Sequence, residues 1–195
     1  MKDLLNPEKA LIFRIVHREN VRAVLENGLR CRNSRRAAGP YVAIGDPDLI
    51  WKREHRVIPI APHGTLSDYI PFYFTPFSPM AYNIKTGYRG ITQRPNADTA
   101  IFVTSLHRLA EHEIPFIFSD RHAYLRAAQF STDLDDLPDF IDWDILQRRD
   151  FRYDGEDPEK TERYQAEALV HRRLPMSALS GVVGATQGTV DEIAN

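Results

Sequence analysis

The sequence predicts a compact domain of mixed α+β architecture, with residues 1–195 forming a single unit. Short apolar runs typical of strands are interspersed with short helical patterns, without the regular strand–helix alternation of a doubly wound parallel sheet. The length of 195 residues suits one hydrophobic core, and a hydrophobic fraction of 43% with ten Phe and eight Tyr excludes a disordered chain. Neither a Gly-x-Gly-x-x-Gly fingerprint nor a Gly-x-x-x-x-Gly-Lys-Ser/Thr loop is present, so any nucleotide must be bound by other means.

Strands are predicted where a short apolar or β-branched run lies between turn-forming residues. The first is residues 11–16, which ends at His17. We expect the strand that contains Pro71 to lie near an edge of the sheet, because proline cannot donate a ladder hydrogen bond. The strands predicted after the first are residues 57–60, 70–74, 101–104, 114–118, 166–171 and 181–184.

Helices are predicted from apolar spacing and from capping residues. The first covers residues 18–28, with Gly28 as its C-terminal stop, and the second has Asp46 as its cap, Pro47 at its first position, and runs towards Arg56. Ser78 or Pro79 begins a third helix. The other predicted helices are residues 106–110, residues 121–129 after a Ser119-Asp120 cap, and residues 140–146 around Trp143, with polar loops at residues 86–96 and 150–160.

The distribution of charge restricts how nucleic acid could bind. A formal net charge of -2 is untypical of a protein that coats duplex DNA, so any contact with nucleic acid must be local. Charged residues do cluster locally, although such runs also occur on faces that are merely solvated. Basic groups gather at Lys52, Arg53, His55 and Arg56, at Arg148, Arg149 and Arg152, and at His171, Arg172 and Arg173, and acidic groups gather at Asp133, Asp135, Asp136 and Asp139.

Several classes of protein are excluded by what the sequence lacks. No apolar run is long enough to span a bilayer, and the N-terminal residues lack the apolar stretch of a signal peptide, so we expect a cytoplasmic protein without a membrane partner. The one cysteine, Cys31, excludes an internal disulfide and a Cys-rich zinc site, and we expect it to be a small buried apolar residue. No convincing cluster of metal ligands is present, so no metal is expected.

Glu167 is the first candidate for chemistry. It lies in a predicted strand directly after a polar loop, where alternation of side chains places it on one face with Gln165 and Leu169. A carboxylate at this position borders a cleft if the loop folds over it. The alternatives are a glutamate that faces solvent from a half-exposed strand and a helical glutamate in an alanine-rich run.

Two further stretches carry polar or aromatic groups in unusual arrangements. The segment His17-Arg-Glu-Asn20 joins the first predicted strand to the first helix, where polar groups often meet ligands, although Asn20 could instead cap the helix. Residues 64–80 are rich in aromatic residues and proline. Within them Phe72 and Phe74 share a strand face and are expected in the core, whereas Tyr73 points the other way and could stack on a flat ring.

Together these stretches resemble the DarT family of bacterial toxins, which are DNA ADP-ribosyltransferases. The resemblance runs from about Leu11 to Gly184. It is carried by His17-x-x-Asn20 with a following Gly28-Leu29, by Gly64-Thr-x-x-Asp-Tyr-x-Pro-Phe-Tyr-Phe-x-Pro-x-Ser-Pro-Met80, by Ser119-Asp120-x-His122-Ala123, and by Arg163-x-Gln-Ala-Glu167-x-Leu-Val. It implies an ADP-ribosyltransferase-like fold: a split mixed β-sheet core with short flanking helices and NAD in the central cleft.

The resemblance also implies roles for individual residues. Glu167 would be the catalytic carboxylate, and Arg53 would hold NAD and support catalysis, with Arg56 as the rival by spacing. His17 would bind the nicotinamide end. Asn20, Tyr73, Met80 and His122 would complete the pocket, and His122 or Glu167 would accept a proton from the acceptor. Where the family often has a basic residue after Phe-x-Pro, this chain has Phe77, which leaves the contacts at that position open.

The implied reaction spends NAD to place ADP-ribose on a base of single-stranded DNA and releases nicotinamide. Thymine is the favoured acceptor and guanine the rival. The loop from about Arg148 to Arg163 would recognise the target, with Arg148, Arg149, Arg152, Tyr153 and Arg163 binding the strand, and a macrodomain antitoxin is the expected protein partner. The alternatives are an ADP-ribosyltransferase that acts on RNA, an NAD glycohydrolase, and a nucleic-acid-binding module without catalytic activity.

Overall fold

The computed structural model describes residues 3–34 and 41–184, so the predicted domain of residues 1–195 extends beyond the described residues at both ends. Seven strands form one sheet in the order β6-β5-β7-β3-β1-β4-β9, and every pairing between them in the described part of the chain is antiparallel. These strands are β6 (Phe130–Ser131), β5 (Phe116–Ser119), β7 (Glu167–His171), β3 (Tyr69–Tyr73), β1 (Leu11–His17), β4 (Thr99–Ser105) and β9 (Gly181–Gly184). A second, two-stranded sheet pairs β2 (Leu29–Arg30) with β8 (Arg173–Leu174).

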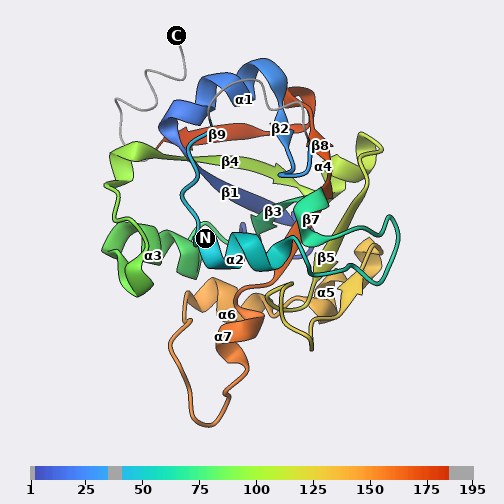
Figure 1. Ribbon diagram of the computed structural model, residues 1–195. Helices are drawn as coiled ribbons and strands as arrows, with labels where there is room; N and C mark the ends of the chain where they lie inside the picture. The colour runs from blue at the N-terminus through green and yellow to red at the C-terminus, as the bar shows by residue number, and fades with distance from the viewer. Residues whose placement is uncertain (1–2, 35–40, 185–195) are drawn as a thin grey trace.

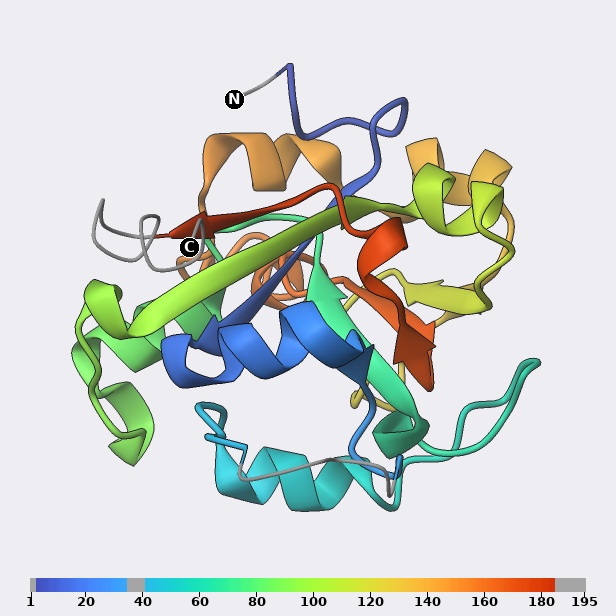
Figure 2. The ribbon, with the colours of Figure 1, turned by 90° about the horizontal axis from the view of Figure 1, so that it is seen from above.

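Short helices flank the large sheet (Figure 1). Seen from above, α1 and α2 lie on one side of β1 and β4, and α6 lies on the other (Figure 2). The α-helices are α1 (Val21–Asn27), α2 (Pro47–Arg53), α3 (Pro79–Thr86), α4 (Leu106–Glu111), α5 (Leu137–Phe140), α6 (Trp143–Arg148) and α7 (Lys160–Arg163), and 3-10 turns connect several of them. The predicted α+β architecture of strands and short helices is confirmed, and the sheet of the described residues is antiparallel where a mixed sheet was expected.

The ends of the helices follow the local signals in the sequence. The side chain of Asp46 accepts hydrogen bonds from two backbone amides in the first turn of α2, and Ser78 accepts one from Ala81 at the start of α3. Gly28 ends α1 with φ at 74°, and a β-carbon at this position would lie 2.4 Å from the carbonyl oxygen of Leu174. A glycine is therefore required where α1 meets β8.

Apolar residues cover both faces of the sheet. The main core contains the fully buried rings of Phe72, Phe74 and Phe102, and Phe72 lies on the face of β3 and β7 that is opposite to Leu169. A smaller cluster on the Leu169 face is formed around Leu66 and Leu169. Since Leu169 shares its face with Glu167, the carboxylate lies on the side of the smaller cluster.

The expectation that Pro71 marks an edge strand is wrong, because β3 lies in the middle of the sheet. β3 pairs with β7 along its whole length, but with β1 only at Phe13 and Tyr73. The sheet therefore opens between β3 and β1 on the side of Pro71, and Arg14 donates a hydrogen bond to the Pro71 carbonyl across this opening. Proline is tolerated where the ladder is interrupted, inside a sheet as at its edge.

Three local predictions are wrong. Residues 121–129 form successive turns and no helix, because Ser119, expected to cap it, hydrogen-bonds the Arg121 carbonyl and the Glu167 amide. Residues 57–60 form no strand beyond the isolated bridge between Val57 and Thr65. The helix expected over residues 140–146 is split, since α5 ends at Phe140 and the Asp142 side chain caps a new helix that begins at Trp143.

Candidate active site

The sheet register brings three of the predicted site residues to one face. Glu167 and Tyr73 are directly opposite each other on β7 and β3. Tyr73 is in turn opposite Phe13 on β1, from which His17 follows at even spacing. Opposite residues on neighbouring strands share a face, as do residues at even spacing along one strand. His17, Tyr73 and Glu167 therefore lie on the same side of the sheet, across the place where β3 and β1 separate.

The carboxylate of Glu167 is buried and held from two sides. Glu167 is only 1% exposed. Arg53 donates from Nη1 to both carboxylate oxygens, at 3.2 and 2.9 Å. On the other side, Nδ1 of His122 lies 3.1 Å from Oε1, and the Ala123 amide donates to the same oxygen at 3.2 Å. The side chain is thus fixed in one orientation by partners from α2 and from the segment after β5.

These partners keep the buried carboxylate ionised. Burial alone would raise the pKa of Glu167, because it penalises the charged form. The charge of Arg53, then that of His122, and the hydrogen bonds from both outweigh burial and lower the pKa to about 2 from its ordinary value of 4.5. The site therefore holds a fixed negative charge throughout the neutral range, which can stabilise a developing positive charge.

Arg53 has one further hydrogen-bond donor beside the Glu167 carboxylate. Its side chain comes from the last turn of α2 and is 11% exposed. Nη1 is bound to Glu167, whereas Nη2 is buried with no hydrogen-bond partner among the described residues. A buried guanidinium nitrogen without an acceptor fits an anionic ligand such as a phosphate oxygen. The rival Arg56 donates to the Leu125 carbonyl, so Arg53 is the arginine that reaches Glu167.

The contacts of His122 determine which ring nitrogen carries the proton. Nδ1 lies 3.1 Å from Glu167 and 3.3 Å from the amide of Tyr124. It can donate to the carboxylate or accept from the amide, but it cannot do both at once. The shorter contact is to a charged acceptor and is the stronger of the two. A proton on Nδ1 leaves Nε2 as the nitrogen that can accept a proton.

Tyr73 and Met80 lie in contact beside the carboxylate. The Tyr73 hydroxyl lies 4.0 Å from the Met80 sulfur, so the strand and the first turn of α3 meet at this pair. Burial, and next the negative charge of Glu167, raise the pKa of Tyr73 above its usual range. The phenol therefore stays protonated at neutral pH and can act only as a neutral wall or as a hydrogen-bond donor or acceptor.

His17 and Asn20 are both buried, and both are held by other residues. Nε2 of His17 faces Nη1 of Arg94 at 3.1 Å, and Nδ1 accepts weakly from the Glu19 amide at 3.3 Å. Asn20 makes no capping bond. Its side chain instead donates to the Val42 carbonyl at 2.8 Å and accepts from the Val42 amide at 2.9 Å, and so attaches the segment before α2 to the end of β1.

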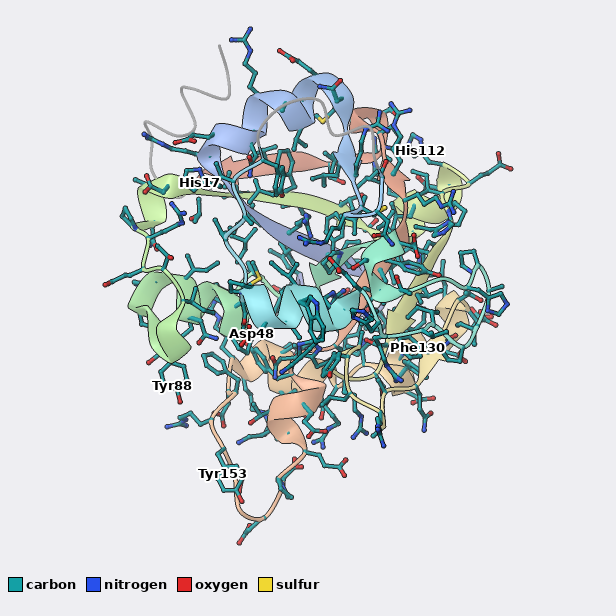
Figure 3. All side chains as sticks on the ribbon, viewed as in Figure 1. His17, Asp48, Tyr88, His112, Phe130 and Tyr153 are labelled. Carbon is teal, nitrogen blue, oxygen red and sulfur yellow. The ribbon has the colours of Figure 1, made fainter. Side chains whose placement is uncertain are left out.

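The residues predicted to bind DNA divide into two groups. Tyr153 is 79% exposed on the loop between α6 and α7, which projects from the body of the protein (Figure 3), and Arg148, Arg149 and Arg152 lie on or before the same loop. Arg152 also pairs with Asp150 at 3.1 Å, but its side chain is 88% exposed. Arg163 differs in being held by two carboxylates, with 3.0 and 2.7 Å bonds to Asp157 and a 3.0 Å bond to Asp142. Within the described chain it therefore fixes the loop.

Two contributors to the site were missed by the sequence interpretation. The hydroxyl of Ser119 accepts from the Glu167 amide at 3.2 Å and fixes the start of β7, a role that neither the predicted helix cap nor its place in the family motif indicated. Arg94 reaches His17 from a polar stretch between α3 and β4, and nothing in the local pattern distinguishes it from a surface arginine.

Among residues 3–34 and 41–184 no group of three or more His, Cys, Asp or Glu side chains could hold a metal ion. Within the described part of the chain, no helix combines the length and apolar character needed to cross a bilayer.

The site and the fold have counterparts among known proteins. The family model of ssDNA thymidine ADP-ribosyltransferase, DarT, matches residues 13–195. A DNA ADP-ribosyl transferase from Escherichia coli O127:H6 is 52% identical over 179 residues, which cover 92% of this chain and 82% of that protein. Thermus sp. 2.9 DarT in complex with ADP-ribosylated ssDNA matches with a TM-score of 0.88 and 29% identity, over 97% of this chain and 88% of that chain.

The same Thermus protein in complex with NAD+ matches with a TM-score of 0.80 and 28% identity, over 97% of this chain and 88% of that chain. These similarities confirm both the ADP-ribosyltransferase-like fold and the resemblance predicted from the motifs. The chain therefore belongs to the DarT family of DNA ADP-ribosyltransferases.

Proposed function

We propose that the protein transfers ADP-ribose from NAD to thymine in single-stranded DNA and releases nicotinamide. The observation that carries the proposal is the buried, ionised carboxylate of Glu167 between Arg53 and His122. The description of the family supports thymine as the acceptor, and guanine is the rival outcome. The Thermus relative bound to NAD+ supports NAD as the donor.

We assign to Glu167 the stabilisation of the ribose in the transition state. When the bond between the ribose carbon and the nicotinamide nitrogen breaks, positive charge develops on the sugar, much as in glycoside hydrolysis. A fixed carboxylate facing that carbon lowers the barrier, and a single group of this kind is typically worth about 3–4 kcal/mol. Arg53 can keep Nη1 on Glu167 while Nη2 donates to the diphosphate of NAD.

The acceptor base must lose a proton as its nitrogen bonds to the ribose carbon. A carboxylate that remains charged down to a pH of about 2 is a weak proton acceptor, so Glu167 is poorly suited to this step. We assign proton removal to Nε2 of His122 in its neutral form, with the proton on Nδ1 directed at Glu167; the ring becomes charged when Nε2 takes up the proton. His17, Tyr73 and Met80 would line the nicotinamide side of the pocket, with Asn20 holding its border in place.

A base inside a duplex cannot reach a buried carboxylate, which is why the proposed substrate is a single strand. The exposed ring of Tyr153 can stack a base, and Arg148, Arg149 and Arg152 can follow phosphates. Arg163 would contribute by holding this loop in shape.

The direct test is incubation of the protein with labelled NAD and separate pools of single-stranded DNA, RNA and protein, followed by mass spectrometry of the modified oligonucleotide. We expect label in the DNA pool and an ADP-ribose adduct on thymine. An adduct on guanine would show that guanine, and not thymine, is the acceptor base. Label in RNA alone, free ADP-ribose without any adduct, or strand binding without loss of NAD would each contradict the proposal.

Two biological expectations rest on the family resemblance. A macrodomain antitoxin would be the partner, and it should remove ADP-ribose from DNA that this protein has modified. A cytoplasmic location follows from the proposed substrate. The first is tested by adding a macrodomain protein encoded beside this chain to the labelled oligonucleotide, where unchanged label would count against the pairing.

A further inference from the structure

A chain of aromatic rings connects the surface of the protein to the catalytic strand. Tyr88 and Tyr82 meet edge to face with ring centroids 6.3 Å apart, and Tyr82 meets Phe151 in the same way at 6.0 Å. Phe151 contacts Tyr164 at 5.3 Å, and Tyr164 lies directly before the segment that carries Glu167. The rings thus join α3, the loop after α6 and the residue that follows α7, three positions before β7 begins.

The outer end of this chain remains open to solvent. Tyr82 is 49% exposed and Tyr88 is 56% exposed, whereas Tyr164 at the inner end is buried. Tyr88 and the exposed Tyr153 project from the same lower left side of the molecule in Figure 3. Single exposed aromatic residues are ordinary, but adjacent ones that continue into the core beside an active site point to a ligand with flat rings.

The charge around these rings suits a polyanion. The sequence has no acidic residue between Asp68 and Asp98, although it has 27 in all. Lys85 is exposed on α3 with Tyr82, and it borders an open pocket of about 510 Å³ whose lining, Lys85, Gln93, Arg94, Pro95 and Asn96, includes no carboxylate. Arg149 covers the ring of Phe77 at 4.0 Å. Rings interleaved with cations characterise surfaces that bind single strands.

We propose that Tyr82 and Tyr88, with Lys85 beside them, bind nucleotides of the DNA strand on one side of the acceptor base. The rings stack on the bases and the lysine pairs with the phosphates. This inference rests on the proposed function, since it extends the strand from the acceptor pocket across α3. Stacking on aromatic faces tolerates any base, so this surface contributes affinity and strand length dependence without selecting the base that is modified.

The test measures the affinity of the protein for fluorescently labelled oligonucleotides of increasing length, first without NAD. In the parent, extension of the strand on one side should strengthen binding. The double variant Y82A/Y88A should lose about 10-fold or more of the affinity for the long strand and little for the shortest one. The matched control Y82F/Y88F keeps both rings and should bind like the parent, and circular dichroism should show that all three proteins are folded.

Equal affinity of parent and Y82A/Y88A for the long strand would overturn the inference. So would light scattering that shows the parent to self-associate through these tyrosines while strand binding stays unchanged. Transfer from NAD is measured separately, with the expectation that the alanine variant raises KM for the long strand and leaves KM for NAD unchanged. If the parent binds strands through these rings but forms no ADP-ribose adduct, the proposed function is wrong, whereas the proposal that this surface binds the DNA strand remains supported.

Discussion

Glu167 shows how a charge can be buried at a functional site. Desolvation works against its ionised form, and the charges of Arg53 and His122 reverse the balance. Both partners lie far from it in the sequence, so the sequence could indicate a carboxylate in a strand but not its partners or its pKa. The ionised state of Glu167 thus depends on its contacts with Arg53 and His122, and each contact can be removed separately by substitution.

The first prediction concerns stability in acid. The pKa of Glu167 in the folded protein is about 2, below its ordinary value of 4.5, so its contribution is present above pH 4.5 and is lost as the pH falls towards 2. The full contribution of the Glu167 pKa shift to the free energy of unfolding is about 3 kcal/mol, of which about 2 kcal/mol should be lost at pH 3. The free energy of unfolding, measured in urea at pH 6 and pH 3, should show this additional loss in the parent and not in Glu167→Gln. Equal losses in both proteins would mean that Glu167 is not held ionised.

The second prediction concerns Arg53. Arg53→Gln removes the charge that does most to lower the pKa of Glu167 and also removes the unpartnered Nη2 donor. We expect KM for NAD to rise by about 10-fold or more, because a charged hydrogen bond is typically worth 1.5–3 kcal/mol. The acid limit of the kcat profile should also move to higher pH. Arg56→Gln is the control, since the Arg56 guanidinium donates to the Leu125 carbonyl and makes no hydrogen bond to Glu167 within the described part of the chain, and an equal effect there would contradict the assignment.

At the scale of elements, the loop between α6 and α7 is braced by ion pairs. Nζ of Lys160 lies between Asp150 and Asp154, at 3.1 and 3.3 Å, and its side chain is 11% exposed. Arg163 forms ion pairs with Asp157, near the C-terminal end of the same loop, and with Asp142, which caps the start of α6. Hydrogen bonds from Arg152 and Lys160 lower the pKa of Asp150 to about 2. Lys160 is therefore a positioning residue for Tyr153 and its neighbours.

The third prediction tests this role. Lys160→Met keeps much of the aliphatic stem but removes the charge, so the loop should loosen while the carboxylate site is unchanged. KM for DNA should rise several-fold with KM for NAD unaffected, and limited proteolysis should cut residues 150–159 faster. Lys160→Arg should restore much of the parental behaviour, because it keeps a cation between the two aspartates. A rise in KM for NAD instead would mean that the residue supports the site and not the loop.

The structure separates what local sequence signals can predict from what they cannot. Helix caps such as Asp46 and Ser78, and the stop at Gly28, depend on neighbouring residues, and they were predicted correctly. The misplacement of Pro71 and the false helix after Ser119 arose because distant partners decide these positions. A local pattern gives the preference of a segment, but the opening of the sheet at Pro71 and the bond from Ser119 to Glu167 exist only in three dimensions.

At the scale of the whole molecule, the antiparallel sheet brings the four motifs of the sequence together. β1 supplies His17, β3 supplies Tyr73, β7 supplies Glu167, and the segment after β5 supplies His122. The sheet order places β5, β7, β3 and β1 side by side, so motifs spread from residue 17 to residue 167 converge on one region. The family resemblance predicted that these motifs act together, and the register of the strands gives the physical reason.

The measurement that tests the central claim most directly is the single-turnover rate of ADP-ribose transfer by Glu167→Gln at saturating NAD and DNA. The claim is that a negative charge at this position stabilises the ribose in the transition state. The rate should therefore fall about 10²–10³-fold, while calorimetry finds the Kd for NAD within a few-fold of the parental value. Glu111→Gln, at an exposed position of α4, should match the parent. A parental rate from the folded Glu167→Gln variant would contradict the account.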